Sequence, residues 1–311
     1  MAPLRISAAC VVAAAVAACG SARGAAVAPP RGLLAFVCEA CRGTNTRELF
    51  VIRTDGSRLT MRARVCGSNG DPAFPSWAPG GARLVLACDF ARGTALWTAR
   101  PAGGTGDALT PIVRRAEQYG PEWSRDGALL TWERRPFGAE TSRVVVARGD
   151  GTRARVVARG ASPSWSRRVR LVFASGDGLF TARADGTARR RLSRSRTTPL
   201  EARWSPDGRA VAFTAPSDAG TAVRILRLTD YRVRTVALTA VEPPGDLVSI
   251  GWAPGGRWLV YAIETRVPTP DPSTENAGVE VWLVDTASGA RKRVFADVAN
   301  QIVGVSWAPV R

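Results

Sequence analysis

Six tryptophans recur through this chain of 311 residues in one shared local context. Each is followed by Ser or Ala, and in most copies by Pro, Asp or Gly, and successive copies are about 40 to 55 residues apart. A unit of this size cannot bury an apolar face alone, so neighbouring units must pack against one another. The repeated residues are Trp77, Trp123, Trp165, Trp204, Trp252 and Trp307.

Each unit has the pattern of four strands. A turn-forming segment follows the tryptophan, and a short apolar run such as 83–87 or 210–213 comes next. A second apolar run, such as 95–99, precedes the fourth strand, and several copies place an Asp-Gly turn between them, as at 150–151. The pattern predicts an all-β fold in which every unit is one four-stranded blade of a β-propeller.

The two ends of the repeat predict how the ring closes. Residues 33–37 and 48–52 supply strands of a first blade that lacks its own tryptophan strand, whereas 302–307 is a tryptophan strand with no blade after it. We therefore expect the C-terminal strand to pair with the first blade, which gives six blades and removes the exposed sheet edges. The repeated tryptophans are expected to pack between blades.

The turn after Trp204 carries the fullest form of the repeat, Trp-Ser-Pro-Asp-Gly at 204–208, and 123–127 matches it in four of five places. With this signature the chain from residue 32 to 311 resembles the TolB-type, WD-repeat-like β-propeller family. The resemblance implies a protein-interaction role at the cell envelope, with loops on one face receiving a peptide or loop of a partner. The separate α/β domain that precedes the propeller in TolB is expected to be missing here.

The N-terminus has the pattern of a targeting segment. Met1 to Arg5 is positively charged and 6–18 is an apolar run too short to span a bilayer, so 1–18 is interpreted as a signal peptide. The residues around Cys19 resemble a bacterial lipobox, which would make Cys19 a lipid anchor and 19–31 an Ala, Gly and Pro-rich tether. An ordinary signal peptide cleaved after Ala26 or Ala28 is the alternative.

Four cysteines lie beyond this segment, at Cys38, Cys41, Cys66 and Cys88. The predicted blades place all four on one face, opposite the tryptophan turns. An even number of neighbouring cysteines in an exported protein indicates disulfides, and we favour Cys38 with Cys41 and Cys66 with Cys88. A redox-active Cys-x-x-Cys or a four-cysteine zinc site is the alternative, and we expect no metal or other cofactor.

Composition excludes several chemistries. The chain has no histidine, which removes Ser-His-Asp and Cys-His nucleophile arrangements and imidazole metal sites. The net charge is +17, but Lys292 is the single lysine and the arginines form no long basic stripe. We therefore expect no nucleic-acid binding. The expected partner is an envelope protein or peptide, or an anionic cell-wall polymer, bound by a monomer that contacts the membrane only through its lipid.

Acidic residues are expected at the mouth of the central channel on the cysteine-bearing face. The position six residues before each tryptophan is occupied by Asp71, Glu117, Arg159, Thr198, Asp246 and Gln301. These side chains form either a ligand or cation site, or acceptors for backbone N–H groups where one blade meets the next. An insertion at 264–278 projects from the same face, as a lid, a partner-binding loop or a tolerated excursion.

Catalysis has little support in the sequence, which contains no Gly-x-Ser-x-Gly elbow and no phosphate-binding glycine loop. A lipid-anchored, non-catalytic binding module is the predicted function. The alternative is a propeller hydrolase or carbohydrate-binding protein that uses acidic residues at the channel mouth, drawn from Glu117, Glu201 and Asp246.

Overall fold

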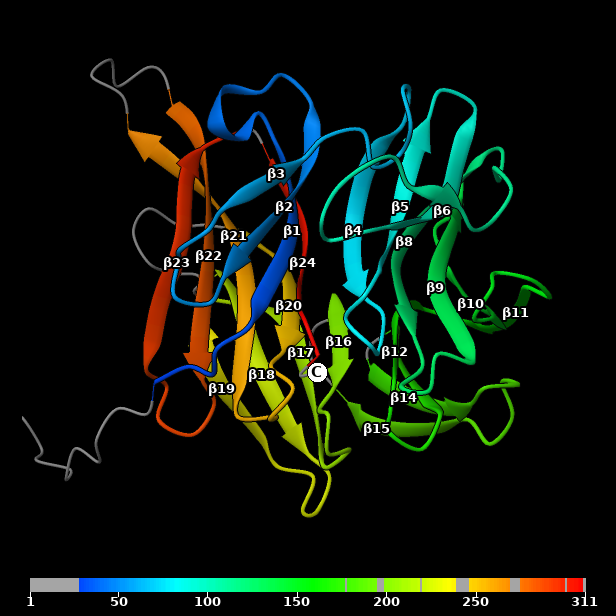
Figure 1. Cartoon of the computed structure of the whole chain (residues 1–311). Coiled ribbons are helices and arrows are strands. Elements are labelled where there is room, and N and C mark those ends of the chain that lie inside the picture. Colours follow the sequence, from blue (N-terminus) through cyan, green and yellow to red (C-terminus); the bar gives the residue numbers. More distant parts are fainter. Residues whose placement is uncertain are drawn as a thin grey trace, which may run out of the picture.

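The computed structural model describes residues 28–176, 178–194, 199–218, 220–238, 246–268, 275–299 and 301–309. Its strands form six four-stranded antiparallel sheets (Figure 1), which are the blades of a six-bladed propeller. One short 3-10 turn, η1 (Cys41–Gly43), interrupts the β structure of these residues. Within them, no helix is long and apolar enough to cross a membrane. The predicted all-β six-bladed fold is confirmed.

The sheet order places one strand of each blade innermost. Blades 1 to 3, from the inner to the outer strand, are β24 (Gln301–Trp307), β1 (Leu33–Glu39), β2 (Arg47–Arg53) and β3 (Thr60–Arg62); β4 (Asp71–Trp77), β5 (Leu84–Phe90), β6 (Gly93–Ala99) and β7 (Asp107–Ala108); and β8 (Ala116–Trp123), β9 (Leu129–Pro136), β10 (Arg143–Arg148) and β11 (Arg155–Arg159).

Blades 4 to 6 follow the same order. They are β12 (Ala161–Trp165), β13 (Arg170–Ser175), β14 (Gly178–Arg183) and β15 (Arg190–Arg194); β16 (Glu201–Trp204), β17 (Ala210–Ser217), β18 (Gly220–Arg227) and β19 (Val233–Leu238); and β20 (Asp246–Trp252), β21 (Trp258–Pro268), β22 (Glu275–Asp285) and β23 (Arg291–Val298).

The turn after each inner strand has a chemical reason for its sequence. In blade 5 the Asp207 carboxylate accepts hydrogen bonds from the Ser205 hydroxyl and the Arg209 backbone N–H, and Gly208 takes a left-handed φ of 72°. Asp126 and Gly127 repeat this arrangement in blade 3. Glycine adopts such a backbone without the steric cost of a Cβ, so this turn reverses the chain tightly. These turns define the Trp-turn face of the propeller.

The core lies between blades rather than within them. Buried residues from adjacent sheets form contiguous clusters, and the indoles of Trp77, Trp165 and Trp307 belong to three of them. Trp165 and Trp252 also donate their indole N–H to backbone carbonyls of the preceding blade, at Glu122 and Arg203. The tryptophans therefore pack blade against blade.

The ring closes as the sequence predicts. Strand β24 pairs antiparallel with β1, with Leu34 opposite Trp307 and Glu39 opposite Gln301. It supplies the inner strand of blade 1 and also packs against the inner strand β4 of blade 2. Gly304 makes this approach possible, because a Cβ there would lie 2.7 Å from Cα of Phe74.

Both disulfides have the pairing that the sequence favours. Cys38 is bonded to Cys41, and Cys66 to Cys88, with Cα–Cα distances of 5.7 Å in each. All four side chains are buried. They lie at the end of the propeller opposite the tryptophan turns, which we call the cysteine face. Cys19 and the predicted signal segment lie outside the described residues.

The insertion at 264–278 is structured differently from the expected loop. Strands β21 and β22 continue their pairing from Glu264 opposite Val279 to Pro268 opposite Glu275, which gives a two-stranded hairpin arm. The neighbouring strands stop earlier, since β20 pairs no further than Glu264 and β23 no further than Gly278. The arm projects beyond the sheet at the upper left of Figure 1. Residues 269–274 lie outside the described part.

The two disulfides are expected to stabilise the propeller unequally. Cys66 and Cys88 are 22 residues apart and Cys38 and Cys41 only three. Since a longer loop loses more chain entropy on closure, the Cys66→Ala/Cys88→Ala variant should lose about 3 kcal/mol of unfolding free energy, and Cys38→Ala/Cys41→Ala roughly half of that. Urea unfolding of the three proteins measures the difference. Equal losses, or a larger loss for the short loop, would contradict this account.

Candidate functional site

The residue immediately before each repeat tryptophan lines the central channel. These residues are Ser76, Glu122, Ser164, Arg203, Gly251 and Ser306. Together with the tryptophans and the prolines of the adjoining turns they enclose a cavity of about 570 Å³ that opens on the Trp-turn face. Its volume is within the range of about 300 to 1,000 Å³ that is typical of ligand pockets.

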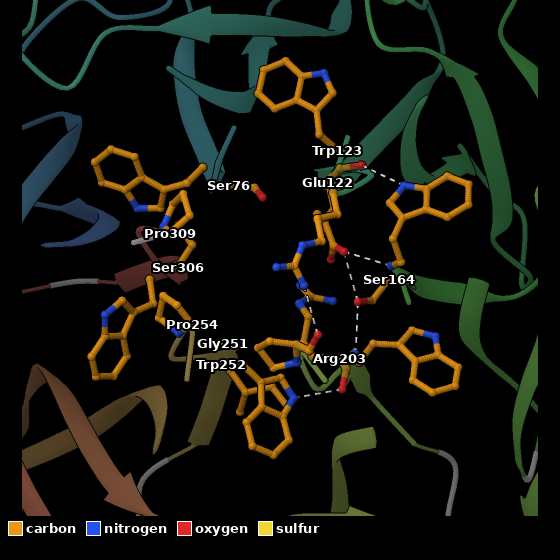
Figure 2. Close-up of a pocket in the computed structure, with 18 of the residues that line it drawn as sticks. Ser76, Glu122, Trp123, Ser164, Arg203, Gly251, Trp252, Pro254, Ser306 and Pro309 are labelled. Carbon is orange, nitrogen blue, oxygen red and sulfur yellow. Dashed lines mark hydrogen bonds between the residues drawn. The ribbon is translucent and has the colours of Figure 1, made fainter. Parts of the chain in front are cut away.

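The cavity wall is chemically asymmetric (Figure 2). Glu122, Ser164 and Arg203, on β8, β12 and β16, lie along one side and include both charged groups of the wall, whereas Ser76 and Ser306 on the other side carry only hydroxyls. Arginines Arg125 and Arg167 from two adjoining turns stand at the mouth and are exposed. Three guanidinium groups and one carboxylate therefore line the cavity among the described residues, which favours an anionic or carbonyl-rich ligand.

Backbone bulges set which side chains enter the channel. In five of the six inner strands the pairing register shifts just before the tryptophan, for example between Ala73 and Ser76 of β4. Strand β16 is the regular exception. A bulge puts two residues opposite one and re-aims the side chains that follow it. The residue before each tryptophan lies at the channel in the five bulged strands and also in the regular strand β16.

Glu122 and Ser164 connect three blades through a chain of hydrogen bonds, and we call such a chain of a glutamate and a serine a relay. Its carboxylate accepts hydrogen bonds from the backbone N–H of Trp165 at 2.8 Å and from the Ser164 hydroxyl at 3.2 Å, both on the next inner strand. The Ser164 oxygen in turn accepts the backbone N–H of Trp204, on the strand after that, at 3.2 Å. The side chains therefore connect β8 to β12 and β12 to β16.

Glu201 makes the equivalent relay two blades further on. Its carboxylate accepts the backbone N–H of Ile250 at 2.7 Å and the Ser249 hydroxyl at 3.3 Å. The Ser249 oxygen accepts the backbone N–H of Val305 at 3.2 Å. The second relay therefore connects β16 to β20 and β20 to β24.

Arg203 is held between the two relays. One guanidinium nitrogen lies 2.5 Å from the Glu201 carboxylate, and another donates to the Ser162 hydroxyl at 3.1 Å. The guanidinium also reaches toward β8, since a Cβ built on Gly120 would lie 3.7 Å from Nη2. Only 19% of the Arg203 side chain and 12% of the Glu201 side chain are exposed. A fixed, largely desolvated cation is therefore presented at the cavity wall.

Burial dominates the titration of both carboxyls. It raises the pKa of Glu122 and of Glu201 above the ordinary value of 4.5, and the Arg203 charge beside them opposes the shift. The pKa of Glu122 is raised a little further by the Glu201 charge. The two relays thus hold carboxyl groups whose charged form the surroundings disfavour.

The sequence-predicted acidic residues do not line this cavity. Asp71 begins β4 and is exposed, and Glu117 lies near the start of β8. Both lie toward the cysteine face, and the cavity opens on the other one. Glu117 forms an ion pair with Arg135 at 2.7 Å and accepts the Tyr119 hydroxyl. The hydrogen bond from Tyr119, with that from Arg135, keeps the pKa of Glu117 below its ordinary value despite partial burial.

Of the remaining predicted positions, those whose side chains the structure describes do not line this cavity either. Gln301 begins β24 and accepts a hydrogen bond from Arg47, while Arg159 ends the outer strand β11 and is not on an inner strand. Asp246 begins β20, with its side chain outside the described part, and Thr198 lies outside it altogether. Glu201 serves as an acceptor between blades, which is the structural role that the sequence left open for acidic residues here.

Few acidic groups line the cavity among the described residues. Glu122 is the one carboxylic acid among those lining the cavity, so no second described carboxylate stands across it for glycoside cleavage. No group of three or more Cys, Asp or Glu side chains is placed to hold a metal ion in this part of the chain. The arrangement suits recognition by a fixed guanidinium, hydroxyls and aromatic walls.

Comparison with solved structures identifies the type of propeller. TolB from Acinetobacter baumannii superposes with a TM-score of 0.71 at 15% identity, over 90% of this chain and 67% of that one. The putative TolB from Agrobacterium tumefaciens gives 0.63 at 16% identity, over 91% of this chain and all of that one. No protein-family model and no curated protein matches the sequence.

Enzymes also share the architecture. An oligogalacturonate lyase in complex with manganese superposes with a TM-score of 0.51 at 13% identity, over 80% of this chain and 70% of that one. Identities this low establish the fold and not the activity. The protein is therefore a TolB-type six-bladed β-propeller in fold.

The opposite pKa shifts of two glutamates predict opposite pH dependences. A raised pKa means that Glu201 stabilises the fold most below pH 4.5, with the contribution declining as pH rises through the raised value. The unfolding free energy of Glu201→Gln relative to wild type should therefore increase as pH is raised from about 4.5 to about 8.

Glu117→Gln is the matched control. Because the pKa of Glu117 is lowered, its contribution is present above pH 4.5 and is lost as pH falls through the lowered value. The stability of Glu117→Gln relative to wild type should therefore decrease as pH is raised from about 3 to about 5. Chemical unfolding at a series of pH values measures both slopes, and slopes of the same sign would contradict the assignment.

Proposed function

We propose that this protein is a non-catalytic, exported binding module that takes a peptide or loop of a partner protein into the channel cavity on the Trp-turn face. The cavity wall carries the proposal: the Arg203 guanidinium is fixed by Glu201 and Ser162 beside free channel volume. A preorganised cation binds a carboxylate or backbone carbonyl without first losing side-chain entropy. The TolB-type neighbours support a protein-interaction propeller in general.

The mouth of the cavity fits an extended chain better than a compact ligand. Arg125 and Arg167 stand on turns of two adjacent blades, and six prolines from five blades complete the rim. Aromatic and proline surfaces contact a peptide backbone over a large area, while arginines select for acidic side chains. The polar side chains of the relays, along one side of the channel, then fix the orientation of the bound segment.

The compartment is proposed on separate grounds. Two disulfides are typical of proteins outside the reducing cytoplasm. A lipobox-like segment precedes Cys19, and the first described residues approach the propeller at the Trp-turn face, where Thr54 donates a hydrogen bond to the Pro30 carbonyl. A lipid on Cys19 would therefore hold the Trp-turn face nearest the membrane.

Site-specific photo-crosslinking in cells tests the binding site. A photoreactive amino acid replaces Ser76 in the channel or, as a control, the exposed Arg92 on the cysteine face. We expect one specific protein adduct from position 76 and not from position 92. Arg125→Ala/Arg167→Ala should weaken this partner about tenfold, since buried arginine contacts are common hot spots, whereas Arg58→Ala/Arg100→Ala should not.

Absence of a protein adduct from position 76 would overturn the proposed site. If Arg125→Ala/Arg167→Ala gives the adduct at wild-type yield, these two arginines do not contribute to partner binding. Mass spectrometry identifies the adduct, and thermal melting of each variant confirms that the propeller is intact.

Lipid attachment is tested independently. In a bacterial host supplied with a labelled fatty acid, the wild-type chain should incorporate label and Cys19→Ser should not, because the thioether that carries the lipid needs the cysteine sulfur. Cleavage of wild type after Ala26 or Ala28, read from the mass of the mature N-terminus, would contradict the anchor.

A further inference from the structure

A second cavity lies on the Trp-turn face, in the seam between blades 3 and 4. Its volume is about 730 Å³. It is lined by residues at the strand ends and turns of β9, β10, β11, β13 and β14. Six of them are arginines: Arg148, Arg153, Arg155, Arg168, Arg170 and Arg183. We call this cavity the arginine groove. It adjoins the channel mouth, because Arg167 lines the channel and Arg168 the groove.

The arginines of the groove outnumber the acids near them, although Asp150 lies close enough to attract Arg148, and Asp185 close enough to attract Arg155 and Arg183. None of the six forms an ion pair with a described carboxylate. Asp185 is the one acid among the described lining residues, and its carboxylate is already hydrogen-bonded to the backbone N–H and hydroxyl of Thr187. A concave surface lined by six arginines and one aspartate attracts anionic groups.

The turn that forms one wall departs from the repeat. Four other blades place glycine at the left-handed position of this turn, with φ near 70°, whereas blade 4 places Val169 there with φ of 55°. A β-branched residue in this conformation is a strained outlier, and such strain concentrates at functional sites. In the same turn, Arg167 and Arg168 stand where blades 2, 5 and 6 have Pro-Gly or Pro-Asp and blade 3 has Arg-Asp. The strained side chain lines the groove.

The floor of the groove is apolar. Val146 and Ala147 are buried in it, and Leu129, Val169 and Ala184 are half-buried. The last three pack on the hydrophobic cluster between blades 3 and 4, so the inter-blade core reaches the surface here. A ligand that covers this floor gains hydrophobic stabilisation in addition to charge.

We propose that the arginine groove binds an acidic protein segment that carries apolar side chains among its carboxylates. The apolar side chains cover Leu129 and Val169, and the carboxylates pair with the surrounding guanidinium groups, which match them in a bidentate geometry. This site is additional to the channel cavity, and it rests on the proposed function only in that both bind protein. A phosphate polymer or an anionic lipid surface pairs with the arginines but leaves the apolar floor uncovered.

Selection from a displayed library of random 12-residue peptides tests the groove. The library is selected on the wild-type protein and, separately, on Arg148→Glu/Arg183→Glu. Peptides enriched on wild type should combine Asp or Glu with Leu, Ile, Val or Phe, and this class should be absent from the selection on the variant. A synthetic peptide from the class should bind the variant at least tenfold more weakly.

Three variants make the result specific. Arg58→Glu/Arg100→Glu changes the same net charge on the same face outside the groove and should bind the peptide within twofold of wild type. Arg125→Ala/Arg167→Ala alters the channel mouth and should also leave it unchanged, so the groove and the channel proposals fail separately. Val169→Gly removes the apolar wall at a position that suits glycine, and should weaken the peptide at least threefold without lowering the melting temperature.

Several outcomes would overturn the proposal. These are no enrichment of acidic peptides, equal affinity for wild type and Arg148→Glu/Arg183→Glu, or unchanged binding by Val169→Gly. Long-chain polyphosphate and phosphatidylglycerol vesicles are measured alongside. If either probe binds wild type more tightly than the peptide and loses this binding in Arg148→Glu/Arg183→Glu, the groove is a phosphate site and the peptide assignment is wrong.

Discussion

The geometry of this propeller depends on how each inner strand is joined to the next around the channel. Four of the six junctions are made by the two relays, in which a buried carboxylate and a serine hydroxyl accept N–H groups of the following blade. At the other two junctions, on either side of β4, the inner strands of the described chain meet by packing, and hydrogen bonds of Thr94 on β6 with Ala116 and Gln118 on β8 add to the junction of blades 2 and 3. Gly304 approaches Phe74, and the Phe74 ring meets the Tyr119 ring edge-on at 5.4 Å. A hydrogen bond fixes both the distance between two strands and their relative orientation, whereas apolar packing fixes only the distance.

The difference between hydrogen-bonded and packed junctions also explains why the charged side chains lie along one side of the channel. The relay strands need groups that accept hydrogen bonds, so Glu122 and Glu201 are placed there and Arg203 offsets their charge. Removing one member of such a set leaves the others buried without a partner, which costs more than the set contributes when complete. The proposed ligand site therefore uses a cation that the fold already requires, and recognition and structure share the same residues.

The sequence predicted the propeller well because its signals are local and repeated. Tryptophan spacing, Asp-Gly turns and the unpaired strand at each end were sufficient to predict six blades and their closure, and the neighbouring cysteines were sufficient to favour both disulfides. The cavity on the Trp-turn face was not among the predicted sites, because those sites were placed at the channel mouth on the cysteine face, where ligand binding stays a prediction. Counting six residues back from each tryptophan also assumes a regular strand. A bulge adds a residue before five of the six tryptophans, which a single sequence does not reveal. Counting back one residue, to Glu122 or Arg203, avoids the bulge and finds the cavity wall.

Closure by β24 sets an order of events during synthesis. Of the described strands, β1 is the first to be made, and its inner partner β24 is the last. Until β24 emerges, the inner edge of β1 has no partner and the packing surface between blades 1 and 2 is incomplete. A nascent chain of this protein therefore carries an open sheet edge from the synthesis of β1 until β24 is available to pair with it. A holdase that covers this edge would act before the final strand is released, when the chain is most prone to pair with a neighbour.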